Sequence, residues 1–122
     1  MFEIIFYEDK NGKAPILDFI HELEFRGNKD SRINTNKIYD YIDFLHNAGI
    51  AAGEPYIKHL DGEIWELRPI RYRILFAAWD SESFILLHHF LKKTQKTPQR
   101  EIDQAKRNLA DYRERSGIYG KY

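Results

Sequence analysis

The chain has 122 residues, of which 43% are apolar, and its 19 Lys and Arg balance its 19 Asp and Glu. This length is typical of one packed domain, so we predict a single domain over residues 1–122. Zero net charge argues against a general nucleic-acid binder, and the lack of cysteine excludes disulfides, thiolate zinc sites and thiol nucleophiles. No stretch approaches the ~20 apolar residues of a membrane span, and the N-terminus lacks a signal-peptide pattern, so we expect a cytoplasmic protein with no membrane association.

The chain begins with a predicted strand and a predicted helix. Residues 2–7 are rich in Phe, Ile and Tyr, which favours a strand, and an Asn-Gly turn follows. Pro15 suits the first turn of a helix, and Gly27 with Asn28 ends it. The apolar stripe of this helix consists of Ile16, Leu17, Ile20 and Leu23.

A second helix is predicted immediately after the first. Asp30 or Ser31 can cap its N-terminus, and Gly49 suits its C-terminus. The connection between the two helices is short, so we expect a helical hairpin. The apolar positions of the second helix recur at spacings of three and four: Ile38, Tyr41, Ile42 and Leu45.

Three consecutive strands are predicted next, over residues 62–68, 71–79 and 84–91, after an approach strand at residues 56–60. In the first, Trp65 and Leu67 alternate with Glu66 and Arg68, as in a strand with one buried face. Pro69 interrupts the pattern because proline cannot donate to a sheet ladder. A polar turn separates the second strand from the third, so the three strands form an antiparallel meander.

The chain ends in a predicted helix with Pro98 at its first position and the apolar stripe Ile102, Ala105, Leu109 and Tyr112. We expect residues 116–122 to fray. The fold class is therefore α+β, with the helical hairpin and the C-terminal helix packed on a small, mostly antiparallel sheet. We predict that the helices cover one face of this sheet and leave the other face partly open.

Positive charge is concentrated in the second half of the chain. Residues 1–60 contain 7 Lys and Arg against 10 Asp and Glu, whereas residues 61–122 contain 12 against 9. Between Arg68 and Arg100 there are seven basic residues and two acidic residues. A local excess of this kind is either a solvated cationic surface or a phosphate-binding footprint, and we favour the second.

Arg68, Arg71 and Arg73 form the sharpest part of this excess. We predict that they are exposed on one face of the meander, where guanidinium groups can fork to phosphate oxygens as lysine cannot. The structural alternative is an ion pair of Glu66 with Arg68 or Arg73, although surface pairs contribute only ~0–1 kcal/mol. The positive field continues at the end of the next strand through Lys92, Lys93 and Lys96.

The sequence contains no familiar nucleotide-binding or metal-binding motif. His88 and His89 are neighbours on a predicted strand and therefore point to opposite faces, so they cannot easily share one metal ion. One of the two could still transfer a proton, since histidine titrates near neutrality. We expect neither a metal ion nor a cofactor.

Several sequence blocks resemble the HigB branch of the RelE/ParE toxin superfamily. The similarity covers essentially the whole chain, and its motifs are specific in combination. They are Lys58-x-Leu60, Trp65-Glu66-Leu67-Arg68, Tyr72-Arg73-Ile74-Leu75 and the block Leu87-His88-His89-Phe90-Leu91-Lys92-Lys93-Thr94-Gln95-Lys96-Thr97-Pro98.

The resemblance implies the toxin of a type II toxin–antitoxin system, and for this branch an mRNA endonuclease that acts on translating ribosomes. It also implies a HigA-like helix-turn-helix antitoxin, through which the toxin would reach operator DNA indirectly. The alternatives are a non-catalytic inhibitor of DNA gyrase resembling the ParE branch and an inactive relative that only binds its antitoxin.

Metal-free RNA cleavage needs a base for the ribose 2′-hydroxyl, cations for the phosphorane and an acid for the leaving oxygen. We therefore expect Arg68, Arg73, Lys92 and Lys93 to be catalytic, with a lysine or a meander histidine transferring protons. RelE has a tyrosine near the end of the last strand, where this chain has Phe90-Leu91-Lys92, so the acid and base stay open. The residues expected to bind RNA are Lys58, Arg71, His89 and Lys96.

Overall fold

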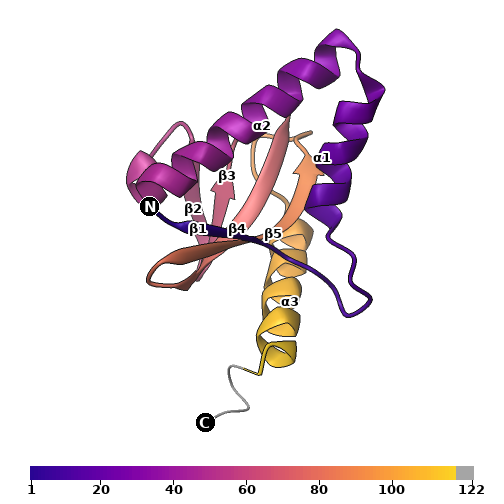
Figure 1. The fold of residues 1–122 in the computed structure, drawn as a ribbon. Helices are drawn as coiled ribbons and strands as arrows, with labels where there is room; N and C mark the ends of the chain where they lie inside the picture. The colour runs from indigo at the N-terminus through magenta and orange to yellow at the C-terminus, as the bar shows by residue number, and fades with distance from the viewer. Residues whose placement is uncertain (118–122) are drawn as a thin grey trace.

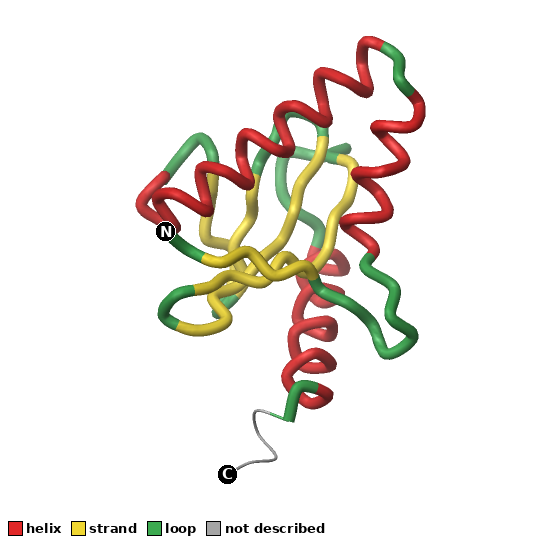
Figure 2. Tube along the Cα trace, in the orientation of Figure 1, coloured by secondary structure: helices red, strands yellow, loops and turns green. Residues whose placement is uncertain are grey.

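A computed structural model describes residues 1–117 and has the predicted α+β fold, in which three α-helices surround a five-stranded sheet (Figures 1 and 2). The strand order is β1-β5-β4-β3-β2, with β1 parallel to β5 and the other pairs antiparallel. The predicted meander is therefore confirmed. The strands are β1 Glu3–Phe6, β2 Ile57–Asp61, β3 Ile64–Leu67, β4 Tyr72–Asp80 and β5 Ser83–Leu91.

The helical hairpin consists of α1 Pro15–Arg26 and α2 Lys29–Ala48, followed by a 3₁₀ turn, Gly49–Ala52. Gly27 ends α1 in a left-handed conformation, with φ of 66°. The cap of α2 differs from our prediction, because Asn28 and not Asp30 or Ser31 lies at the N-cap. Its side-chain oxygen accepts a hydrogen bond of 2.8 Å from the Ser31 N–H, which satisfies one of the unpaired donors at the helix start.

Helices cover both faces of the sheet, so the prediction of one partly open face is wrong. The hairpin packs on one face through a core that contains Ile20, Ile38 and Phe76. The last helix, α3 Gln99–Arg115, packs on the other face against Leu75 and Ile85. The reason is that β4 and β5 contain runs of consecutive apolar residues, which place apolar side chains on both faces of the sheet. Each face is therefore buried by a helix. We call the second face the α3 face.

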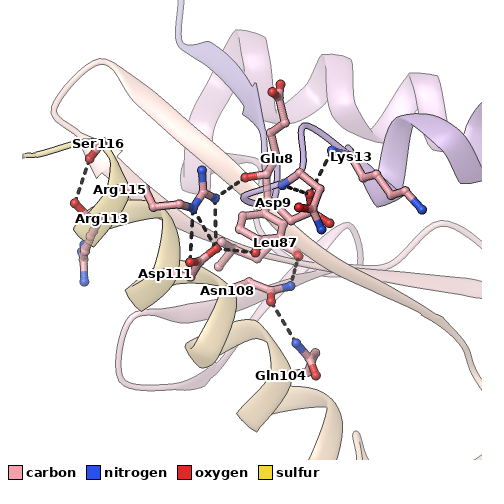
Figure 3. Close-up of polar contacts among 12 residues, drawn as sticks. Glu8, Asp9, Lys13, Leu87, Gln104, Asn108, Asp111, Arg113, Arg115 and Ser116 are labelled. Carbon is pink, nitrogen blue, oxygen red and sulfur yellow. Dashed lines mark hydrogen bonds and ion pairs between the residues drawn. The ribbon is translucent and has the colours of Figure 1, made fainter.

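The start of α3 also differs slightly from the prediction, since Pro98 is the N-cap and Gln99 is the first helical residue. On the α3 face, β5 contains a bulge at Leu87, between His88 and Leu86, which pair with Leu75 and Phe76 of β4. The Asn108 side chain donates a 2.8 Å hydrogen bond to the Leu87 carbonyl, so α3 satisfies the irregular part of the ladder (Figure 3).

The C-terminal part of α3 is tied to the end of β1. Asp111 accepts a hydrogen bond of 2.7 Å from the Tyr7 hydroxyl and forms an ion pair of 2.9 Å with Arg115, which also donates to the Glu8 carbonyl (Figure 3). Burial, and then the Asp111 carboxylate, raise the pKa of Tyr7 to about 12. Most of the tail predicted to fray, residues 118–122, lies outside the described residues. No helix in residues 1–117 is long and apolar enough to cross a bilayer.

Candidate active site

Two arginines and a threonine surround one buried carboxylate on the α3 face. Glu66, on β3, is only 3% exposed, and its Oε1 lies 3.6 Å from Nε of Arg68 and 3.9 Å from Nε of Arg73. Its Oε2 accepts a hydrogen bond from the Thr97 hydroxyl, immediately before α3. We call these four residues the Glu66 cluster. Both ion pairs that the sequence suggested as a structural alternative are therefore present.

Strand register brings the two arginines together. Leu67 of β3 pairs with Ile74 of β4, so Arg68 and Arg73 face each other at the next position of the antiparallel pair. Their side chains point to the α3 face because Leu67 and Ile74 belong to the core under the hairpin. The predicted proximity of Arg68 and Arg73 is thus a consequence of the short β3–β4 connection.

Arg73 was predicted to be exposed, and this is wrong: its side chain is only 8% exposed. One guanidinium nitrogen, Nη1, donates hydrogen bonds to the carbonyls of Ile70 (3.1 Å) and Tyr72 (2.9 Å). Ile70 has φ of 36°, an uncommon conformation for a β-branched residue, so Arg73 supports a strained turn. Burial lowers the pKa of Arg73, the Glu66 carboxylate opposes this shift, and the Arg68 charge adds to it.

Arg68 is the more accessible of the two arginines. Its side chain is 27% exposed, and its second carboxylate neighbour, Glu54, lies 3.9 Å from Nη1. The Nε atom of Arg68 is buried without a hydrogen-bond partner in the described residues. Because Nε is buried, the exposed part of this guanidinium is what a phosphate oxygen can reach.

Exposed lysines surround the Glu66 cluster. Lys58 of β2 pairs with Glu66 in the ladder. Residues 92–98, which we call the lysine loop, connect β5 to α3 and carry Lys92, Lys93 and Lys96. Within residues 1–117, none of these four lysine side chains makes an ion pair or a hydrogen bond, so their charges are available to a ligand. Thr97 links the lysine loop directly to Glu66.

The other two residues predicted to bind RNA lie elsewhere. Arg71 precedes β4 and forms an ion pair of 3.0 Å with Asp30 of α2. His89 lies on the hairpin side of the sheet, where its ring stacks on Phe19 with centroids 4.3 Å apart. Burial, and secondarily the neighbouring His88, lower the pKa of His89 to about 4, so its ring is neutral at pH 7. We therefore leave Arg71 and His89 out of the proposed site.

Two pockets flank the lysine loop. One, of about 600 Å³, lies between β2 and the start of α3, and Lys96 and Thr97 are among its lining residues. The other, of about 280 Å³, is lined by Phe90, Lys93 and Glu101, among others. No group of three or more His, Cys, Asp or Glu side chains in residues 1–117 is placed to hold a metal ion. The site thus consists of cations, hydroxyls and a carboxylate beside open pockets.

Comparison with protein families gives a match over residues 15–110 to the family described as phage-derived protein Gp49-like (DUF891). This match covers most of the chain and includes the hairpin, the meander and most of α3. The chain belongs to the Gp49-like family. Comparison with curated proteins gave no match.

The Gp49-like family is a RelE-like toxin family, and membership implies an antitoxin partner. The predicted relationship to the RelE/ParE superfamily is confirmed at this level, while the HigB branch stays a prediction. Thr97 and Glu101 were not predicted as site residues of this Gp49-like chain. Their positions depend on the packing of α3, which places Thr97 against Glu66 of β3 and Glu101 against His88 of β5.

Proposed function

We propose that this chain is the toxin of a type II toxin–antitoxin system and an endonuclease that cleaves mRNA on translating ribosomes, without a metal ion or cofactor. The observation that carries the proposal is Arg68, a partly exposed guanidinium that lies beside Arg73, together with the four exposed lysines on β2 and the lysine loop. Family membership supports the toxin role.

The proposed reaction is attack of the ribose 2′-hydroxyl on the adjacent phosphate, which releases a 2′,3′-cyclic phosphate and a 5′-hydroxyl. Arg68 contacts the phosphate oxygens that gain charge in the transition state, and Arg73 adds a second positive charge beneath it. Lys92 or Lys93 protonates the leaving 5′-oxygen. Lys58 and Lys96 hold flanking phosphates of the RNA strand.

The proposed partner is a HigA-like helix-turn-helix antitoxin, which would also connect the toxin to operator DNA. We propose that this antitoxin covers the cationic edge formed by the lysine loop and Lys58, or prevents its approach to the ribosome. A complex that still cleaves mRNA at the full rate would contradict both forms of inhibition.

The test is induction of the chain in a bacterium that lacks the antitoxin, with pulse labelling of protein and DNA synthesis. We expect protein synthesis to fall first, with cleavages in mRNA. Arg68→Ala should lower the cleavage rate by about 10²–10³-fold, as removal of one preorganised transition-state donor does. The matched control is Arg26→Ala, which removes an exposed arginine that pairs with Glu22 on α1, and it should leave toxicity intact.

Two results would overturn the proposal. The first is a fall in DNA synthesis before protein synthesis, with accumulation of gyrase–DNA adducts, which would assign the chain to gyrase inhibition. The second is full toxicity and full mRNA cleavage by an Arg68→Ala protein expressed at the normal level.

A further inference from the structure

A histidine and a glutamate form a hydrogen-bonded pair beside the lysine loop. His88, on β5, points to the α3 face, and its Nε2 lies 2.7 Å from Oε1 of Glu101 in the first turn of α3. Both side chains are partly buried, with 21% and 19% of their surfaces exposed. A carboxylate accepts hydrogen bonds and does not donate them, so Nε2 carries the proton and Nδ1 is left as an acceptor. No partner of this Nδ1 occurs among the described residues.

Glu101 places the pair beside the proposed RNA site. Glu101 lines the 280 Å³ pocket together with Lys93 and Phe90. Phe90 pairs with Arg73 in the β4–β5 ladder, and its ring stacks on His88 with centroids 6.1 Å apart. The pair and the Glu66 cluster therefore lie on the same face of the sheet, with His88 on β5, Glu66 on β3, and Leu75 of β4 between them.

We propose that His88 is the general base of the RNA cleavage proposed above and that Glu101 is its positioning residue; the inference rests on that proposed function. Nδ1 of His88 takes the proton of the 2′-hydroxyl while the 2′-oxygen forms its bond to phosphorus. The bond from phosphorus to the 5′-oxygen breaks, and the leaving oxygen takes a proton from the Lys93 ammonium. The imidazolium then releases its proton to water and Lys93 regains one, so one proton is removed and one supplied in each turnover.

Charged groups around the pair determine its electrostatics. Glu101 stabilises the imidazolium that forms on His88, as the carboxylate of a catalytic triad does. Arg100 lies 3.7 Å from the other oxygen of Glu101 and weakens this effect, and Lys93 lines the same pocket. On the opposite face of β5, His89 is the nearest titratable neighbour, and it stays neutral at pH 7.

The alternative is a purely structural role, in which the pair only joins β5 to α3. The two accounts differ in the pH profile and in the response to the leaving group. We therefore propose to measure cleavage of ribosome-bound mRNA from pH 5 to pH 9 with wild type, His88→Gln and Glu101→Gln. The amide of His88→Gln can still donate to Glu101 but cannot take up a proton. His59→Gln is the control, because His59 is an exposed histidine that also bonds through Nε2, to the Gly62 carbonyl.

We expect His88→Gln to lose about 10²–10⁴-fold in rate, the range of general acid–base catalysis, and to lose the acid limb of the profile. Glu101→Gln should lose less and move the acid limb to lower pH, because removal of the carboxylate disfavours the protonated ring. An RNA with a bridging 5′-sulfur releases a thiolate that needs no proton. This substrate should restore the rate of Lys93→Ala and leave His88→Gln slow.

If wild type cleaves no RNA, the proposed function fails and the inference fails with it. If wild type cleaves and His88→Gln keeps about the same rate and profile, only the inference fails. Rescue of His88→Gln by the 5′-sulfur would make His88 the acid and overturn its role as the base. If His88→Gln does not fold, the test passes to Glu101→Gln, and an unmoved acid limb there overturns the inference.

Discussion

Replacement of Arg73 by alanine tests whether the Glu66 cluster stabilises the sheet as well as the proposed site. The change removes an ion pair of 3.9 Å to a carboxylate that is 3% exposed, and two hydrogen bonds to the Ile70 and Tyr72 carbonyls. Breaking a buried pair costs about 3–5 kcal/mol. Because Arg68 and Thr97 still hold Glu66, we expect a loss at the lower end of this range, about 3 kcal/mol of unfolding free energy.

The measurement is urea unfolding at pH 7, followed by tryptophan fluorescence, since Trp65 and Trp79 lie in the sheet. A loss of this size in a domain of this length lowers the melting temperature by about 10 °C. Glu66→Gln in the Arg73→Ala background removes a buried charge that has lost one of its two arginine partners. The double variant should therefore lose less than the sum of the single variants, with a coupling of about 1 kcal/mol.

Arg107→Ala is the stability control, because Arg107 is an exposed arginine on α3 that bonds only to Gln104 in the described residues. Its unfolding free energy should stay within about 0.5 kcal/mol of wild type. An equally small change in Arg73→Ala would refute the structural role of this residue. Strict additivity with Glu66→Gln would show that the two charges are not coupled.

The other predictions concern the lysine loop, His89 and metal dependence. Thr97→Val should release the lysine loop from Glu66 and slow cleavage of ribosome-bound mRNA about tenfold, and Thr97→Ser should keep the wild-type rate. The control is Thr35→Val, which removes a buried hydroxyl from α2 and should not change the rate. The pKa of His89 is about 4 in the folded protein and 6.5 in the unfolded chain, so only the unfolded chain takes up a proton between these values. The urea midpoint should therefore fall as pH drops from 6.5 to 4. His89→Phe should make the urea midpoint less dependent on pH in this range. Cleavage of mRNA should survive EDTA, with a separate control that the ribosomes, which need magnesium themselves, stay intact. If EDTA abolishes cleavage on intact ribosomes and one specific divalent ion restores it, the metal-free mechanism is contradicted.

Much of the fold follows from local patterns. The apolar spacing in α1 and α2 predicts both helices, and the alternation around Trp65 predicts β3. Each of these patterns involves only a few neighbouring residues, so it can be recognised in the sequence without knowledge of the tertiary structure. The N-cap of α2 was missed by only two or three residues because Asn28, Asp30 and Ser31 are all good capping residues, and only the backbone conformation distinguishes them.

The burial of Arg73 and Glu66 could not be predicted in this way. Each residue alternates with apolar neighbours, as a solvent-facing residue does, and the helix that covers both comes from the other end of the chain. Packing between segments that are distant in the sequence thus buries a charge pair that the local pattern predicts to be exposed. The sequence left open which of His88 and His89 transfers a proton for the same reason, since only the positions of α1 and α3 show which ring is stacked and which is held by a carboxylate.

Zero net charge and an RNA-binding edge are compatible because the acids near this edge are already paired. Asp61 forms an ion pair with Lys106, Glu63 with Arg113, and Glu66 with both of its arginines. Two guanidinium groups share the buried Glu66 carboxylate, and the exposed Glu54 offsets the second positive charge only from the solvent side, where its field is screened. Four exposed lysines without an ion pair in residues 1–117, Lys58, Lys92, Lys93 and Lys96, lie on β2 and on the lysine loop next to this cluster. The cationic edge is therefore produced by the pairing of charges in the fold, and the total composition of the chain conceals it.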